Sequence, residues 1–135
     1  MSSKGRPYKT VVVDGHEILV GRGDAENDLL TFEVGEPQDF WLHVAGGVAG
    51  SHVVVRNPER LDTLPKHVLE RAGQLAAWHS KARGRARVEV HVCRVADVGK
   101  RRGAPVGEVE LRRWQRLRVD GRAAAPAPSD GDTPS

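Results

Sequence analysis

Two strand-like runs joined by a glycine-rich loop constrain the fold of this chain more than any other segment. The first run is Phe40-Trp41-Leu42-His43-Val44, and the second is Ser51-His52-Val53-Val54-Val55. Bulky and β-branched side chains favour strands, and the intervening Gly46-Gly47-Val48-Ala49 permits backbone angles that other residues avoid. We therefore expect the two runs to pair and to form a shaped surface around the loop.

Apolar side chains at spacings of three and four predict one main helix over residues 65–81. A shorter helical segment of marginal length is expected at residues 25–32, and a loop at residues 98–106. β-branched or alternating runs predict five further strands, at residues 10–13, 17–20, 88–93, 107–111 and 115–119. We expect residues 10–13 to pair with residues 17–20, and residues 107–111 to pair with residues 115–119. The sequence thus predicts an α+β fold, in which a mixed or antiparallel sheet packs against one main helix with a short additional helix.

The length of 135 residues, with 39% hydrophobic and 29% charged residues, predicts one domain. We expect this domain at residues 10–119, after a flexible lead-in at residues 1–9. A disordered tail is expected at residues 120–135, which are rich in Ala, Pro, Ser, Gly and Asp. The single Cys93, the polar N-terminus and the lack of a long apolar run favour a cytoplasmic protein that does not engage a membrane.

Positive charge gathers in the C-terminal half of the predicted domain, although the net charge of the chain is only +3. Residues 81–118 hold twelve Lys and Arg against four Asp and Glu, a balance of +8. Because phosphate contacts depend on clustered Lys and Arg, this asymmetry indicates a polyanion partner. The alternative is a solubilising charged face, which the charge alone does not exclude.

Three adjacent cations, Lys100, Arg101 and Arg102, stand between Gly99 and Gly103. A glycine-flanked loop lets backbone amides approach a phosphate, and Arg pairs with phosphate through two hydrogen bonds. The segment is therefore a candidate phosphate clamp. It lacks the glycine spacing of a nucleotide-binding P-loop, and the alternative is a mobile turn that carries exposed charge.

The three tryptophans differ in their surroundings. Trp114 lies among arginines at positions 112, 113 and 116, which is typical of residues that stack on an unpaired base. Trp41 and Trp78 fall on a strand and on the packed helix, so we expect both to belong to the core. The candidate nucleic-acid contacts here are Arg112, Arg113, Trp114 and Arg116.

Histidines at positions 43, 52, 79 and 91 raise the question of a metal site or of acid–base catalysis. Their spacing matches no metal-binding motif, so neither a metal nor another cofactor is predicted. A nucleophile formed by Ser51 and His52 with Asp39 is also disfavoured, because adjacent strand residues point to opposite faces. We therefore predict no catalytic residue and no small-molecule substrate.

Five short motifs occur in an order and spacing that resemble those of the NFACT-R family, an RNA-binding domain known as the C-terminal part of ribosome-rescue factors. The motifs lie at residues 15–28, 39–43 (Asp-Phe-Trp-Leu-His), 50–53 (Gly-Ser-His-Val), 75–83 (Ala-Ala-rich, ending near Ser-Lys) and 100–107. The last motif departs from the family, since Pro105-Val106-Gly107 replaces its direct Pro-Gly step. The resemblance implies a free-standing bacterial version of this domain.

The resemblance implies a non-catalytic module that binds structured RNA, either tRNA or ribosomal RNA, in translation or ribosome rescue, with the ribosome as a further partner. Together with the basic cluster, it places phosphate contacts at Lys100, Arg101 and Arg102, which the arginines around Trp114 extend. It also implies that three residues of the central motifs contact a nucleotide or shape the surface: His43, Ser51 and His52.

Two other functions stay open at this point. One is a protein-interaction adaptor that docks on a ribosomal or tRNA-processing protein through the loop around Gly46 and the face that carries Trp41. The other is a hydrolase that uses His43 or His52. Salt sensitivity separates the first from RNA binding, because binding driven by phosphate contacts weakens steeply with salt.

Overall fold

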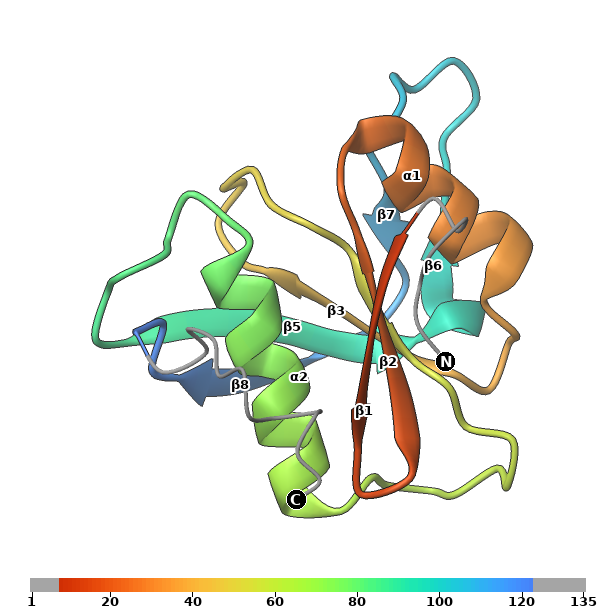
Figure 1. Ribbon diagram of the computed structural model, residues 1–135. Helices are drawn as coiled ribbons and strands as arrows, with labels where there is room; N and C mark the ends of the chain where they lie inside the picture. The colour runs from red at the N-terminus through yellow and green to blue at the C-terminus, as the bar shows by residue number, and fades with distance from the viewer. Residues whose placement is uncertain (1–7, 123–135) are drawn as a thin grey trace.

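A six-stranded antiparallel sheet, in the order β1-β2-β4-β3-β5-β8, forms the frame of the protein (Figure 1). The computed structural model describes residues 8–122. The strands of this sheet are β1 (Tyr8–Val13), β2 (His16–Gly21), β3 (Phe40–Val44), β4 (Val53–Val55), β5 (Val88–Arg94) and β8 (Gln115–Val119). The other elements are α1 (Asp24–Leu29), the π-helix η1 (Leu30–Val34), α2 (Lys66–Trp78), the 3₁₀-helix η2 (Val95–Asp97) and the small two-stranded sheet of β6 (Val98–Gly99) and β7 (Glu110–Leu111).

The main helix α2 lies across one face of the sheet (Figure 1). Alternation along the strands turns apolar side chains toward it, as in β3, where Phe40, Leu42 and Val44 join this core. The helix contributes Val68 and the small residues at positions 72, 76 and 77, which let it approach the sheet closely. This layer is the larger of the two apolar clusters. Because alternate residues of each strand point into it, the residues between them lie on the opposite face of the sheet.

The second face of the sheet is covered only in part. A smaller cluster, which includes Leu19, Leu30 and Trp41, fills the space beneath η1 and the β6–β7 pair. The strands β5 and β8 extend beyond this cover (Figure 1). The polar residues of β3, β5 and β8 on this face are therefore available to form a site.

The predicted fold class is confirmed: the protein is α+β, with an antiparallel sheet, one main helix and one short helix. The predicted pairing of the two runs that flank the glycine loop is confirmed as well, because β3 and β4 are antiparallel neighbours. The main helix is shorter than predicted and ends at Trp78. The short helix continues into η1, which ends at Val34.

The prediction that residues 107–111 pair with residues 115–119 is wrong. β7 pairs with β6, and β8 pairs with β5. The predicted loop at residues 98–106 accordingly begins with a strand, β6. The backbone amide of Arg112 donates to the carbonyl of Asp97 at 2.8 Å, which holds β7 beside β6 and sends the chain on toward β5.

Both ends of the predicted domain shift slightly. β1 begins at Tyr8, so two residues of the expected lead-in belong to the sheet, and residues 1–7 lie outside the described part of the chain. At the other end, Gly121 exchanges backbone hydrogen bonds with Gly84 and Arg85. Residues 120–122 are therefore fixed to the turn after α2, while the rest of the predicted tail, residues 123–135, is not described.

Candidate functional site

Strands β3, β5 and β8 place a row of polar side chains on the face of the sheet away from α2. His43 lies opposite His91, and His91 lies opposite Arg116. Residues directly opposite each other in antiparallel strands share a face. The carboxylate of Glu89 on the same face lies 3.6 Å from the ring of His91 and 3.5 Å from Arg116. We call this surface the open face: His43, Glu89, His91, Trp114, Arg116 and Arg118.

A hollow of about 400 Å³, the histidine hollow, adjoins the open face. Its base carries Trp41, His43, His52 and His91, and its walls are the glycine loop before β4 and the segment at residues 107–111. The rings of His43 and His52 lie 5.3 Å apart, edge to face, and both flank Trp41. The structure thus brings together the two histidines that the sequence singled out.

The backbone of the glycine loop needs its glycines. Gly46 and Gly47 have φ angles of 81° and 71°, in the region that side chains with a Cβ avoid. Beyond them the loop is joined to the end of α2, because the amide of Lys81 donates to Ala49 and the amide of Ser51 donates to His79. The wall of the histidine hollow is therefore held in place by the main helix.

Both histidines of the central motifs are neutral at pH 7. Burial lowers the pKa of His43, and burial together with the neighbouring His43 lowers the pKa of His52 to about 3. The Trp41 indole donates to the hydroxyl of Thr31, which lies 3.0 Å from Nδ1 of His52. The Thr31 hydroxyl therefore links the Trp41 indole to the ring of His52. The two rings thus bring neutral hydrogen-bonding groups to the hollow, whose lining also includes the acidic residues Asp24 and Glu108.

Ser51 lies apart from the two histidines. Its hydroxyl donates to the carbonyl of Gly21, and its side chain lines a separate hollow of about 610 Å³ beside the C-terminal end of α2. The two hollows share only the backbone around Gly50 and two residues of α1, Asp24 and Asn27. Ser51 and His52 therefore face different spaces, as the alternation of strand residues predicts.

The second hollow carries a group of cations that the sequence analysis did not identify. We call it the basic hollow, and its charged lining residues are Lys9, Arg22, Asp24, Lys81 and Arg83. These residues come from β1, from the turn between β2 and α1, and from the turn after α2. No local motif connects them, because the fold alone brings the three segments together.

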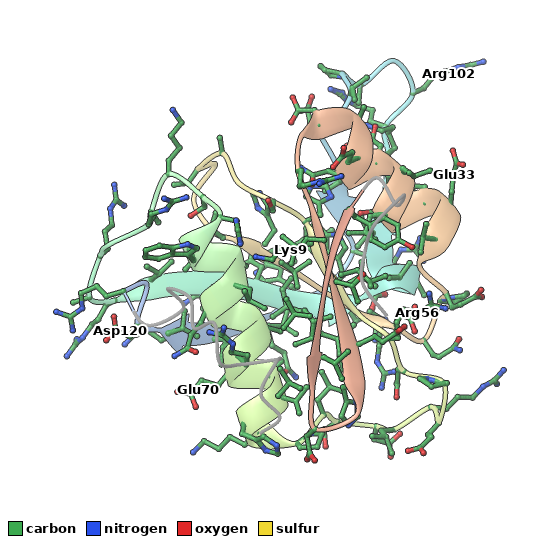
Figure 2. The ribbon with its side chains drawn as sticks, in the orientation of Figure 1. Lys9, Glu33, Arg56, Glu70, Arg102 and Asp120 are labelled. Carbon is green, nitrogen blue, oxygen red and sulfur yellow. The ribbon has the colours of Figure 1, made fainter. Side chains whose placement is uncertain are left out.

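The basic loop at residues 100–103 divides into two parts. The ammonium of Lys100 donates to the carbonyls of Pro105 and Glu108 at 2.8 and 2.7 Å, and it pairs with Asp28 on α1 at 3.2 Å. Its three protons are therefore occupied. Arg101 is half exposed and lies 3.8 Å from the carboxylate of Glu108, and Arg102 projects at the outer end of the loop (Figure 2). Of the three cations, only the two arginines present free donors to a ligand.

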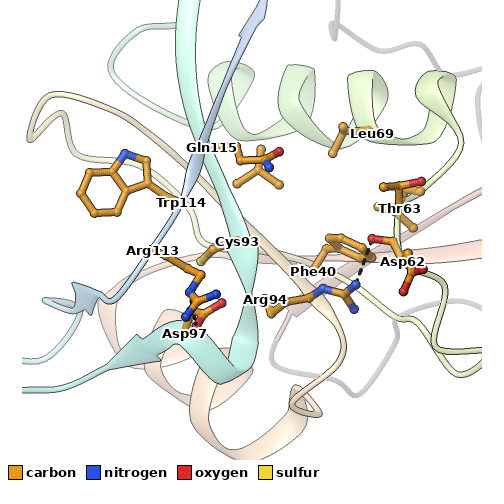
Figure 3. A pocket seen from close by; sticks show the side chains of 12 residues that line it. Phe40, Asp62, Thr63, Leu69, Cys93, Arg94, Asp97, Arg113, Trp114 and Gln115 are labelled. Carbon is orange, nitrogen blue, oxygen red and sulfur yellow. Dashed lines mark hydrogen bonds and ion pairs between the residues drawn. The ribbon is translucent and has the colours of Figure 1, made fainter.

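Trp114 is 47% exposed and lies beside a third hollow, of about 340 Å³ (Figure 3). Its ring lies 5.2 Å from that of His91. The lining of the hollow is mixed, with apolar residues such as Phe40 and Leu69 and polar ones such as Asp62, and Arg113 pairs with Asp97 at 3.7 Å. An exposed indole beside this hollow, with arginines on either side in the sequence, has surroundings that suit an unpaired base.

The other two tryptophans, which the sequence predicts to lie in the core, differ in how deeply they are buried. Trp41 is 2% exposed, and its indole nitrogen is hydrogen-bonded. It cannot serve as the docking surface of an adaptor. Trp78 is half-buried, and the guanidinium of Arg83 lies 4.6 Å from the centre of its ring.

The described residues place two limits on the site. Within residues 8–122, no group of three His, Cys, Asp or Glu side chains lies close enough to hold a metal ion. No helix in the same part of the chain has the length and apolar character needed to cross a membrane.

Comparisons with known proteins agree with this architecture. The model of the family described as NFACT protein RNA binding domain matches residues 6–113. The chain is 36% identical over 115 residues to the Rqc2 homolog RqcH of Streptococcus suis, a match that covers 84% of this chain and 20% of that protein. It is 33% identical over 111 residues to the Rqc2 homolog RqcH of Bacillus subtilis, over 78% of this chain and 19% of that protein. It thus spans about a fifth of the length of these relatives.

A solved structure has the same fold. The C-terminal part of the fibronectin/fibrinogen-binding protein from Streptococcus suis superposes with a TM-score of 0.77 at 32% sequence identity. The match covers 87% of this chain and 46% of that one. The sheet and the main helix described above are therefore shared with a protein of related sequence.

Proposed function

Because the chain belongs to the NFACT RNA-binding domain family, we propose that it binds structured RNA, either tRNA or ribosomal RNA, and catalyses no reaction. Its similarity to two RqcH proteins, named as Rqc2 homologs, supports a role in ribosome quality control with the ribosome as a partner. The RNA lies on the open face and reaches the loop that carries Arg101 and Arg102.

One observation carries this proposal: exposed arginines in β8 and just before it stand beside an exposed tryptophan on a part of the sheet that η1 and the β6–β7 pair leave uncovered. The side chain of Arg116 is 77% exposed, that of Arg113 is 79% exposed, and Arg112 and Arg118 are exposed as well. Such residues contact the phosphate backbone and supply most of the affinity. Trp114 between them stacks on an unpaired base, which a loop or bulge in a structured RNA provides.

The histidine hollow adds contacts of another kind. Neutral imidazoles donate and accept hydrogen bonds without attracting anions in general. At the edge of a phosphate-binding surface, such groups suit base edges and 2′-hydroxyls, the features that distinguish RNA from DNA. His43 is the more accessible of the two neutral rings, while His52 supports it from a buried position.

The test is a titration of the purified, nucleic-acid-free protein against labelled tRNA, a ribosomal RNA fragment and duplex DNA at ~50 and ~200 mM salt. We expect binding to one RNA that weakens with salt and exceeds binding to DNA. Arg116→Ala should weaken binding and lower the salt slope by about 1. The matched control is Lys66→Ala, which removes one exposed cation from α2 on the opposite side of the sheet.

The same titration separates RNA binding from its rivals. If Arg116→Ala and Lys66→Ala bind RNA with the same affinity and salt slope, the open face is not the interface. If the protein has no salt-sensitive affinity for any RNA, the proposal fails.

A further inference from the structure

The basic hollow at the C-terminal end of α2 is a second concentration of positive charge, on a different part of the molecule from the arginines of β8. Lys9 extends from β1 (Figure 2), and Lys81 and Arg83 follow the helix. Facing them is one acidic lining residue, Asp24, while Arg22 is paired with Glu26 at 3.3 Å. The hollow has a volume in the range of small-ligand sites.

Two cations of this hollow, Lys9 and Lys81, have no ion-pair partner among the described residues. Across residues 8–122, neither Lys9 nor Lys81 has a carboxylate within 4 Å of its ammonium. Arg83 stacks on Trp78 and donates its Nε to the Trp78 carbonyl at 2.8 Å. This contact holds the guanidinium of Arg83 beside the Trp78 ring. Lys9, Lys81 and Arg83 therefore all bring positive charge to the lining of the hollow.

His79 supplies an independent observation. Its Nε2 atom is buried and has no hydrogen-bond partner within the described structure, although its ring lines the hollow. Burial and the nearby Lys9, Arg83 and Arg71 lower the pKa of His79, so the ring is neutral at pH 7. Buried polar atoms in native proteins are almost always paired. The fold therefore leaves a polar atom without a partner beside the cations of the hollow.

We propose that the basic hollow binds a phosphate group of the RNA backbone. The proposal rests on the RNA binding argued above and adds a second point of attachment to it. Lys9, Lys81 and Arg83 supply the charge, and the ring of His79, whose Nε2 atom is buried in this structure, turns toward the hollow to donate a hydrogen bond to a phosphate oxygen. Since the hollow shares the backbone around Gly50 with the histidine hollow, an RNA bound on the open face continues along the glycine loop to reach it.

The charge contribution is tested with Lys9→Ala/Lys81→Ala in the full chain, with labelled tRNA and the ribosomal RNA fragment as probes. We expect affinity to fall about tenfold and the salt slope to fall by about 1, because the phosphate in the hollow loses both of the lysines that neutralise it. Lys66→Ala is the matched control, because Lys66 is an exposed lysine at the other end of α2. Thermal unfolding followed by circular dichroism checks that each variant is folded.

The role of the nitrogen is tested with two replacements of His79. His79→Gln keeps a donor at a similar reach, whereas His79→Phe keeps the ring and removes the donor. We expect the Gln variant to retain most of the RNA affinity and the Phe variant to lose it. In the wild-type protein, the NMR signal of the His79 ring should shift when RNA is added.

The outcomes distinguish this inference from the proposed function. If Arg116→Ala weakens RNA binding while Lys9→Ala/Lys81→Ala does not, and the His79 signal is unmoved, the hollow is no RNA site and the function stands. If the wild-type protein binds no RNA at either salt concentration, both fail. A shift of the His79 signal together with a salt-dependent decrease in the affinity of the double variant supports the site.

Discussion

The ammonium of Lys100 lies 3.2 Å from the carboxylate of Asp28 and binds two carbonyls of its own loop. This lysine therefore joins the β6–β7 loop to α1, and that loop forms one wall of the histidine hollow. Lys100, Arg101 and Arg102 thus have different roles, although they are adjacent in the sequence. Lys100 positions the loop, and the two arginines that follow it are available to a ligand.

Replacing Lys100 should affect stability more than replacing Arg102. Lys100→Ala removes charge-assisted hydrogen bonds from a partly buried ammonium and should lower the free energy of unfolding by about 1–2 kcal/mol. Arg102→Ala, at an exposed position, should change it by less than ~0.5 kcal/mol. Urea unfolding of both variants measures the difference. Equal midpoints for the two variants would show that the loop does not depend on Lys100.

Trp114→Ala should weaken binding to single-stranded or looped RNA by about 1–3 kcal/mol, because one stacked base loses its platform. Binding to a perfect RNA duplex should change much less, since its bases stay stacked on one another. The control is Val106→Ala, which shortens another exposed apolar side chain. Fluorescence anisotropy with an oligonucleotide and a duplex gives both affinities, and an unchanged oligonucleotide affinity would rule out the stacking role.

The protein should lose stability as the pH falls below about 6.5. His52 has a pKa of about 3 in the folded protein, below the value of 6.5 in the unfolded chain. Between these values the unfolded chain binds the extra proton, so the free energy of unfolding falls with decreasing pH, by up to about 1.4 kcal/mol per pH unit for one group. His43 acts in the same direction.

The contribution of His52 can be isolated with His52→Gln, which keeps a hydrogen-bond acceptor near Thr31. Urea unfolding of both proteins at pH 7.5 and pH 5 measures the pH dependence. We expect the free energy of unfolding to fall more from pH 7.5 to pH 5 in the wild-type protein than in the variant. The same decrease in both would mean that His52 does not titrate as its burial requires.

Gly50→Ala should destabilise the protein by about 1–3 kcal/mol through overpacking. A Cβ at this position would lie 2.6 Å from the Cβ of Ser80, where the glycine loop meets the end of α2. Because the loop separates two of the hollows, RNA affinity should fall as well. Ser80→Gly removes the opposing atom, so the double variant should recover part of the stability lost in Gly50→Ala. Additive effects of the two changes would contradict a direct clash.

The local elements could be predicted because their signals are local. Phe40–Val44 alternates between a face toward α2 and a face away from it, and its predicted bounds are those observed. The stripe of α2 likewise follows from a spacing of three and four. In contrast, β6 and β7 each have two residues, which carry too little of an alternating pattern to specify a partner.

The parts of the site differ in the same way. The two motifs that contain His43 and His52 lie close in the sequence, so the pairing of their strands could be predicted, but that the two rings share one surface could not. The basic hollow could not, because Lys9 and Lys81 belong to distant segments that meet only when β1 and the end of α2 take their places in the fold. Nor does the sequence distinguish Lys100 from Arg101, since the carbonyls and the carboxylate that bind Lys100 are placed by the loop and by α1.

Among the described strands, β8 forms one edge of the six-stranded sheet. An exposed edge carries unpaired backbone amides and carbonyls that can join the edge of a second copy and begin aggregation. Arg116 and Arg118 stand at alternate positions along β8, so two copies brought edge to edge would repel each other. Removing these arginines should therefore reduce solubility as well as RNA affinity. A loss of RNA affinity in such a variant can be assigned to the binding site only after light scattering shows that the variant is monodisperse.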